Sequence, residues 1–178
     1  QGGVGYMGGA SPYGVISIVS DVDGDGLQDV VTGNGAYRLD GSAIWENGQP
    51  DGLPAIADLD GDGVPELVVA SHPATIRVLN AKTGVVKHTI AMGGINAGPP
   101  VIADFDGDGE LEIGVQRDNH SQAIPCDYSV LEYADSVGLS VKWTSPLHIC
   151  SGFFTATAFD FNGDGSVEVV THDDCNIV

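Results

Sequence analysis

The sequence predicts an all-β fold built from four repeated units, and three observations carry this prediction. The same acidic nine-residue segment occurs four times, starting at residues 21, 58, 104 and 160. Residues typical of β-strands flank each copy on both sides. The chain of 178 residues contains 26 glycines and only 17% charged residues, which suits many short strands and turns. No segment has the pattern of a long helix.

Each acidic segment, named loops 1 to 4 in chain order, has the ligand pattern of a calcium site. Ca²⁺ takes about six to eight oxygen ligands, which side chains at positions 1, 3, 5 and 9 and a backbone carbonyl at position 7 would supply. Glycines at positions 4 and 6 permit the positive φ angles of a tight loop. The predicted ligands are Asp21, Asp23, Asp25, Leu27 and Asp29; Asp58, Asp60, Asp62, Val64 and Glu66; Asp104, Asp106, Asp108, Glu110 and Glu112; and Asp160, Asn162, Asp164, Ser166 and Glu168. Four Ca²⁺ ions are expected, with loop 4 the weakest site because Asn162 replaces an aspartate.

An EF-hand is the alternative calcium site, and the sequence excludes it. The EF-hand loop ends with a bidentate glutamate at position 12, between two helices. Position 12 is here threonine or valine, and the last acid, at position 9, leads directly into strand sequences such as Val30–Thr32 and Leu67–Val69. Because extended sequences such as Ile16–Val19 also precede the loops, each loop is expected to join the two strands of a β-hairpin.

The loops recur after 37, 46 and 56 residues, a period typical of propeller and solenoid repeats. The second interval supplies two more strands, at 75–79 and 85–90, and the first supplies strands at 36–39 and 42–45. The third interval is longer through an insertion at 119–127 and a hairpin at 131–141. Four antiparallel strands per repeat are the blade of a β-propeller.

The phrases Gly98–Gly109 and Phe159–Gly165 resemble the FG-GAP or VCBS repeats of integrin-α-type β-propellers and of large secreted bacterial repeat proteins. The resemblance covers about residues 15 to 178. It implies a propeller, calcium in the hairpin loops, and an extracellular or cell-surface location in adhesion or ligand binding. It does not imply one activity, because the same module also occurs in hydrolases, lyases and lectins.

The expected organisation is a Gly-rich segment at 1–14 followed by blades at about 15–50, 53–92, 99–147 and, in part, 153–178. Propellers close with about four to eight complete blades, so we expect part of a larger propeller. A four-bladed ring closed by residues 1–14 is the alternative. The opening Gln1 and its Gly-rich segment suggest a piece of a longer protein.

The charge of the chain restricts its partners. The formal net charge is −19, with only six Lys and Arg residues. The chain therefore offers almost no positive charge to the phosphates of a nucleic acid. An anionic polymer could be held only through calcium bridging. No apolar stretch approaches the ~18 residues of a membrane span.

Three cysteines, Cys126, Cys150 and Cys175, leave at least one residue without a partner in this segment. If the calcium loops lie on one face of the propeller, all three cysteines fall on the opposite rim. Cys150 is then the expected common partner, with Cys126 favoured over Cys175. Three unpaired cysteines are the alternative.

We expect a calcium-binding extracellular module for adhesion or ligand binding, with a protein or glycan ligand, and no enzyme. The Gly-rich Gly3–Gly8 has no flanking strand or helix for a phosphate site, and no protease or hydrolase motif occurs. Trp45 and Trp143 fall in fourth strands, where packing between sheets is expected. The acids outside the loops are interpreted as solvated turn residues, among them Asp40, Asp51, Asp118, Asp127 and Asp135. A segment of a secreted polysaccharide lyase or hydrolase and a building block of a surface filament are the alternatives.

Overall fold

The computed structural model describes residues 16–118, 126–147, 155–173 and 176–177. All regular structure in these residues is β-strand, as predicted, and the strands pair antiparallel. Among the described residues there is no helix long and apolar enough to cross a membrane.

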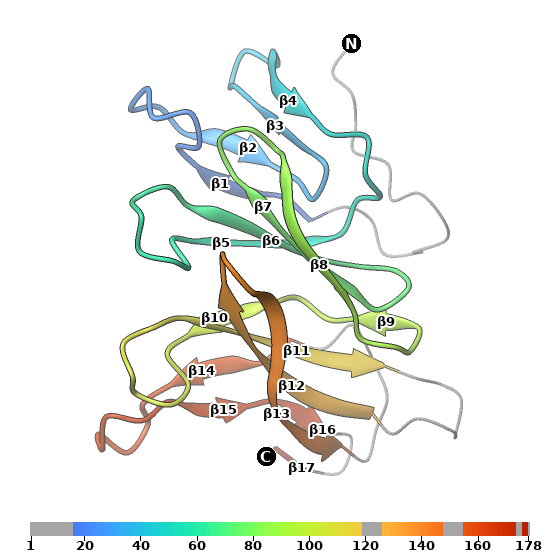
Figure 1. Ribbon diagram of the computed structural model, residues 1–178, viewed down its shortest axis with the longest axis vertical. Helices are drawn as coiled ribbons and strands as arrows, with labels where there is room; N and C mark the ends of the chain where they lie inside the picture. Colours follow the sequence, from blue (N-terminus) through green and yellow to red (C-terminus); the bar gives the residue numbers. More distant parts are fainter. Residues whose placement is uncertain (1–15, 119–125, 148–154, 174–175, 178) are drawn as a thin grey trace.

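The strands form sheets in chain order (Figure 1). Sheet 1 contains β1 (Ile18–Ser20), β2 (Asp29–Val31), β3 (Gly35–Tyr37) and β4 (Ala43–Glu46). Sheet 2 contains β5 (Leu53–Ala57), β6 (Glu66–Ser71), β7 (Thr75–Asn80) and β8 (Val86–Ala91). Sheet 3 contains β9 (Asn96–Ala97), β10 (Val101–Ala103), β11 (Glu112–Asp118), β12 (Cys126–Ala134) and β13 (Gly138–Leu147). Sheet 4 contains β14 (Thr157–Phe159) and β15 (Glu168–Val170), followed by the separate pair β16 (His172–Asp173) and β17 (Asn176–Ile177).

Sheets 1, 2 and 3 each run from first to fourth strand in sequence order, because each strand pairs antiparallel with the next one in the chain. In sheet 3 the short β9, which the sequence did not predict, pairs with the far end of β11. The four hairpins β1–β2, β5–β6, β10–β11 and β14–β15 carry loops 1 to 4, confirming the predicted hairpins. All four loops project to the same side of the stack, the left in Figure 1.

The sheets stack face to face, and apolar side chains fill the spaces between them. Every residue of β6 is buried, because both faces of this strand are covered. Leu67 and Val69 face sheet 1, where they join a cluster with Val31 and Trp45. Val68 and Ala70 point the other way, into a second cluster with residues of sheet 3. A third cluster, which includes Phe105 and Ala156, joins sheets 3 and 4.

A β-bulge occurs at the same place in sheets 1, 2 and 3. The pairing of the third with the fourth strand shifts directly after Ala36, Val78 and Val130. On its other side, each of these residues pairs with a residue of the second strand of its sheet. That residue always lies ten positions after the first aspartate of the acidic loop in the same sheet. The bulge is therefore a repeated feature, and such bulges re-aim side chains near functional sites.

The acidic residues outside loops 1 to 4 were all interpreted as solvated turn residues, and this interpretation was wrong for three of them. Asp51, Asp118 and Asp127 have at most 4% of their surface exposed. Asp51 accepts hydrogen bonds of 2.8 Å from the amides of Gly33 and Gly52, which ties the connection between sheets 1 and 2. Burial raises the pKa of this carboxyl group. The dipeptide Asp51–Gly52 predicted a solvated turn, but the stacked sheets bury Asp51.

The other two buried acids are held within sheet 3. Asp127 forms an ion pair with Arg117, and Asn96 donates a 3.3 Å hydrogen bond to Asp118. Asp40, by contrast, is exposed as expected. Cys126 is buried at the start of β12, and Cys150 and Cys175 lie outside the described residues, so the disulfide pairing stays a prediction. The Gly-rich 1–14 segment also lies outside them.

Candidate metal centres

Backbone conformation gives the four loops one common shape. The glycines at positions 4 and 6 all have positive φ angles, from +71° at Gly61 to +90° at Gly109 and Gly165. A residue with a Cβ would be strained there. In every loop the amide of the glycine at position 6 donates a 2.9 Å hydrogen bond to the position-1 aspartate. The loop fold is therefore set by its own sequence.

Two further hydrogen bonds recur in each loop. The amide of position 7 donates to the position-5 aspartate at 2.7 to 2.9 Å. The amide of position 2 donates to the carboxylate at position 9 at 2.7 to 3.1 Å. The acid at position 9, which is the first residue of the second strand, thereby ties the start of the loop to its end and leaves its second oxygen available to another partner.

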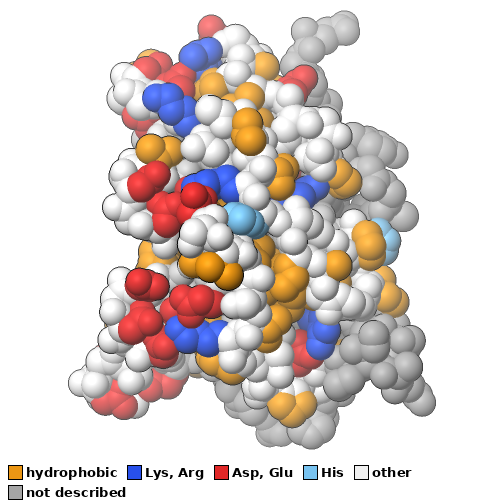
Figure 2. Space-filling view, in the orientation of Figure 1, with side chains coloured by type: hydrophobic (Ala, Val, Ile, Leu, Met, Phe, Trp, Pro, Cys, Tyr) orange, Lys and Arg blue, Asp and Glu red, His pale blue; other side chains and the backbone are white. Residues whose placement is uncertain are grey.

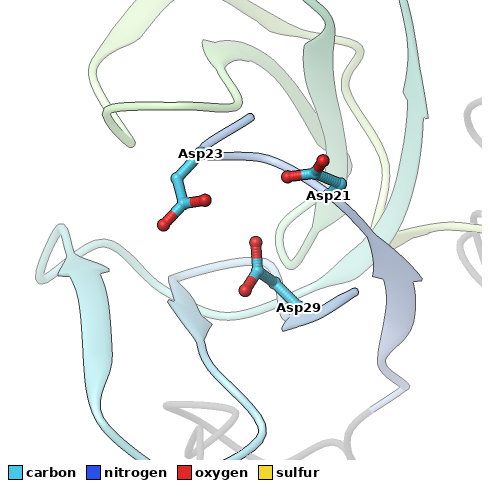
Figure 3. A group of neighbouring side chains, drawn as sticks. All are labelled: Asp21, Asp23 and Asp29. Carbon is cyan, nitrogen blue, oxygen red and sulfur yellow. The ribbon is translucent and has the colours of Figure 1, made fainter. Parts of the chain in front are cut away.

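Three of the loops bring carboxylates together as a cation site requires. In loop 1 these are Asp21, Asp23 and Asp29, which point toward one another (Figure 3), with ligand atoms all within 4.8 Å. Loops 2 and 3 gather their acids at positions 1, 3 and 5 within the same distance: Asp58, Asp60 and Asp62, and Asp104, Asp106 and Asp108. Hard cations such as Ca²⁺ prefer these oxygen ligands, so the donor set fits the predicted metal.

Not every predicted ligand lies in these groups. Asp25 belongs to loop 1 but stays outside its cluster, and Glu66 and Glu112 at position 9 stay outside those of loops 2 and 3. In loop 4 the amide nitrogen of Asn162 donates a 2.8 Å hydrogen bond to Glu168, and Asp160 accepts three backbone amides. The amide of Gly165 is the main cause that lowers the pKa of Asp160. The position-7 carbonyls of Leu27, Val64, Glu110 and Ser166 remain predicted ligands.

A basic side chain reaches into each of loops 1 to 3, a feature that the sequence analysis missed. Arg38 lies 2.6 Å from Asp23 in loop 1. Lys87 lies 3.2 Å from Asp60 and 3.0 Å from Glu66 in loop 2. Lys142 contacts Asp106, Asp108, Glu112 and Glu132 at 2.6 to 3.8 Å around loop 3. The structure places no such basic contact on the described residues of loop 4.

The β-bulge explains the placement of both lysines. His88 stands opposite Val78, and Val86 opposite Leu79, so Lys87 is the extra residue of the bulge in sheet 2. Lys142 is the extra residue in sheet 3 for the same reason. Each lysine is thus turned toward the loop of its own sheet. Only the pairing register, and no sequence motif, could have revealed this.

The lysines compete for the carboxylates that were predicted to bind the metal. Glu66 and Glu112 are fully buried, and burial raises the pKa of both. Their remaining oxygen accepts a 3.0 Å hydrogen bond from Lys87 or Lys142. Burial alone would lower the pKa of Lys87, but hydrogen bonds to Asp135, Glu66 and Asp60 raise it. In loops 2 and 3, a lysine of the same sheet therefore already contacts the acid at position 9. In loop 1 the basic residue Arg38 contacts Asp23, and no lysine or arginine of the described residues contacts Asp29 at position 9.

Acidic side chains gather along the edge of the stack where the loops project (Figure 2). Loops 3 and 4 are neighbours there, since a Cβ added to Gly107 would lie 3.6 Å from the carbonyl oxygen of Gly165. The edge is a rim of acidic loops, defined here as residues 21–29, 58–66, 104–112 and 160–168.

Comparisons with known proteins agree with this repeated architecture. Residues 58–115, from loop 2 to the strand after loop 3, match the family of FG-GAP-like repeats. The predicted resemblance to FG-GAP repeats is therefore confirmed for residues 58–115. No match was found among curated proteins.

A solved structure resembles most of the chain. The crystal structure of the V. cholerae biofilm matrix protein Bap1 superposes with a TM-score of 0.51 and 26% sequence identity over 88% of this chain. The matched region is only 28% of the Bap1 chain, so the chain spans just over a quarter of the length of that protein.

Proposed function

We propose that this chain, in which residues 58–115 match an FG-GAP-like repeat, is a calcium-binding extracellular module for adhesion or ligand binding. One observation carries the proposal: in three separate loops, carboxylate oxygens from one repeated motif converge within 4.8 Å of one another. Similarity to a biofilm matrix protein supports the extracellular, adhesive role. We further propose that the stacked sheets are blades of a β-propeller.

Calcium has a structural task in this proposal and also a binding one. Bound ions would hold the acidic hairpins closed by neutralising carboxylates that otherwise repel one another. The rim of acidic loops would then present a row of cations on one side of the stack. An extracellular protein or glycan with carboxylate groups could be held there through calcium, since basic side chains are few.

The stoichiometry tests the proposal. We expect about four Ca²⁺ ions per chain, with affinities of about 10⁻⁴ to 10⁻³ M typical of extracellular modules. Isothermal titration calorimetry measures both. Asp21→Asn should remove one site, because the amide keeps one acceptor oxygen for the loop amides but loses the second oxygen and the charge. A stoichiometry of zero or one in the unaltered chain would contradict the proposal.

The lysine of loop 2 supplies a sharper prediction. Lys87→Met should raise the calcium affinity of loop 2 about 3- to 20-fold, because a cation beside the site is removed and Glu66 becomes available. The amide signals of Gly61 and Gly63 in a ¹⁵N correlation spectrum report this loop during a calcium titration.

Lys82→Met is the matched control. Lys82 lies exposed in the β7–β8 turn, so its replacement removes the same charge without touching a loop. An equal change of affinity in both variants would show that only net charge matters and would refute the internal competition.

A further inference from the structure

A nitrogen-bearing ring links sheet 1 to sheet 2 and sheet 2 to sheet 3 in the same way. Trp45 in β4 donates a 2.9 Å hydrogen bond from its indole nitrogen to the carbonyl oxygen of Ala81, the residue directly after β7. His88 in β8 makes the corresponding 2.9 Å bond from Nε2 to the carbonyl of Asp135, directly after β12. Because a carbonyl only accepts, Nε2 of His88 is the donor.

A glycine lies against the ring in both contacts. A Cβ added to Gly84, three residues after Ala81, would come within 2.4 Å of the ring of Trp45. A Cβ added to Gly138, three residues after Asp135, would come within 2.9 Å of the ring of His88. The ring on the fourth strand of one sheet therefore covers the turn between the third and fourth strands of the next.

Trp143 occupies the same position in sheet 3. Trp45, His88 and Trp143 stand opposite Ala36, Val78 and Val130, the residues at which the three β-bulges begin. Trp45 is 9% exposed, whereas Trp143 is 38% exposed. Its ring packs edge-on against Phe105 and tilted against Tyr128, at centroid distances of 6.4 and 6.2 Å. Within the described part of the chain, its indole N–H donates no hydrogen bond.

We propose that Trp143 and the part of sheet 3 beside it are a docking surface for a β-turn that completes the sheet begun by β14 and β15, the sheet that already packs on sheet 3. The turn is the one between third and fourth strands, with a carbonyl that accepts the indole N–H and a glycine three residues later. The contact would continue the series that Trp45 and His88 begin. It is independent of calcium, and it holds whether or not the loops bind metal.

The test uses the two tryptophans of the chain, which give two indole signals in a ¹⁵N correlation spectrum. Trp45→Phe assigns them. The probe is a synthetic hairpin with the sequence of residues 74–92, closed by a terminal disulfide, whose hairpin fold is verified by cross-strand contacts. We expect the indole signal of Trp143 to shift saturably at millimolar peptide and its exchange with water to slow about tenfold, while that of Trp45 stays unchanged.

The matched control is the same peptide with Gly84→Asn. Asparagine tolerates a positive φ, so the turn still forms, but its side chain fills the space that the ring needs. Trp143→Phe, which keeps a ring but loses the N–H, should bind the unaltered peptide about 3- to 10-fold more weakly. Equal shifts with both peptides, or none at about 5 mM, would overturn the proposal.

Two further measurements keep the proposal falsifiable. The first extends the chain after residue 178 by a copy of residues 78–91, so that the strand begun at Asn176–Ile177 can continue. The indole N–H of Trp143 should then be protected from exchange with water. This protection should be absent when the copy carries Gly84→Asn. The second is dilution of the chain alone. A concentration-dependent Trp143 signal would assign this face to a second copy instead and refute the proposal.

Discussion

Removal of calcium with excess chelator is expected to lower the thermal midpoint of unfolding by about 5 to 20 °C. A ligand that binds only the folded state stabilises it by RT ln(1 + [L]/Kd), which is roughly 0.5 to 1.5 kcal/mol per site at millimolar calcium and the expected affinities. Four loops with common backbone geometry would add their contributions. Differential scanning calorimetry with and without calcium measures the shift.

A variant with aspartate replaced by asparagine at position 1 of all four loops is the control. Both oxygens of each position-1 aspartate accept backbone amides of the loop; asparagine keeps one of these acceptors and loses the other, together with the charge that holds a cation. Its midpoint should be low already and insensitive to chelator. An unchanged midpoint of the native chain in chelator would show that the loops contribute nothing to stability through calcium.

Leu67→Ala is expected to destabilise the fold by about 2 to 5 kcal/mol. Leu67 is fully buried between sheets 1 and 2, where it packs in the cluster with Val31, Val69 and Trp45. The substitution leaves a cavity that the flanking sheets, fixed by their own hydrogen bonds, fill only partly. Urea unfolding followed by circular dichroism measures the loss.

Val85→Ala is the matched control, because Val85 is 62% exposed after the β7–β8 turn. Its cost should stay within about 0.5 kcal/mol. Equal costs for the two substitutions would mean that the faces of sheets 1 and 2 do not pack as described. Such a result would also remove the basis for a stack of repeats.

The candidate metal loops were predictable because local sequence fixes them. The position-1 aspartate, the two glycines with positive φ and the acid at position 9 all interact within nine residues. The hairpin context followed from the strand sequences on either side. The same reasoning failed for Asp51 and Asp118, since their burial depends on elements distant in the chain.

The lysines and the ring contacts illustrate the opposite case. Trp45, His88 and Trp143 stand 24, 30 and 39 residues after the first aspartate of their loops, so no constant spacing marks them as equivalent. Insertions in the turns change the distance along the chain, whereas strand pairing restores the same place in each sheet.

The sequence by itself determined the all-β class, the four hairpins and the conformation of the acidic loops, because each depends on side chains and glycines that act over a few residues. Tertiary structure alone decided which acids are buried, that Lys87 and Lys142 reach the loops, and that Trp143 matches Trp45. These features arise from strand register, β-bulges and the stacking of sheets, which are cooperative and long-range. The spacing of residues along the chain therefore does not reveal these features.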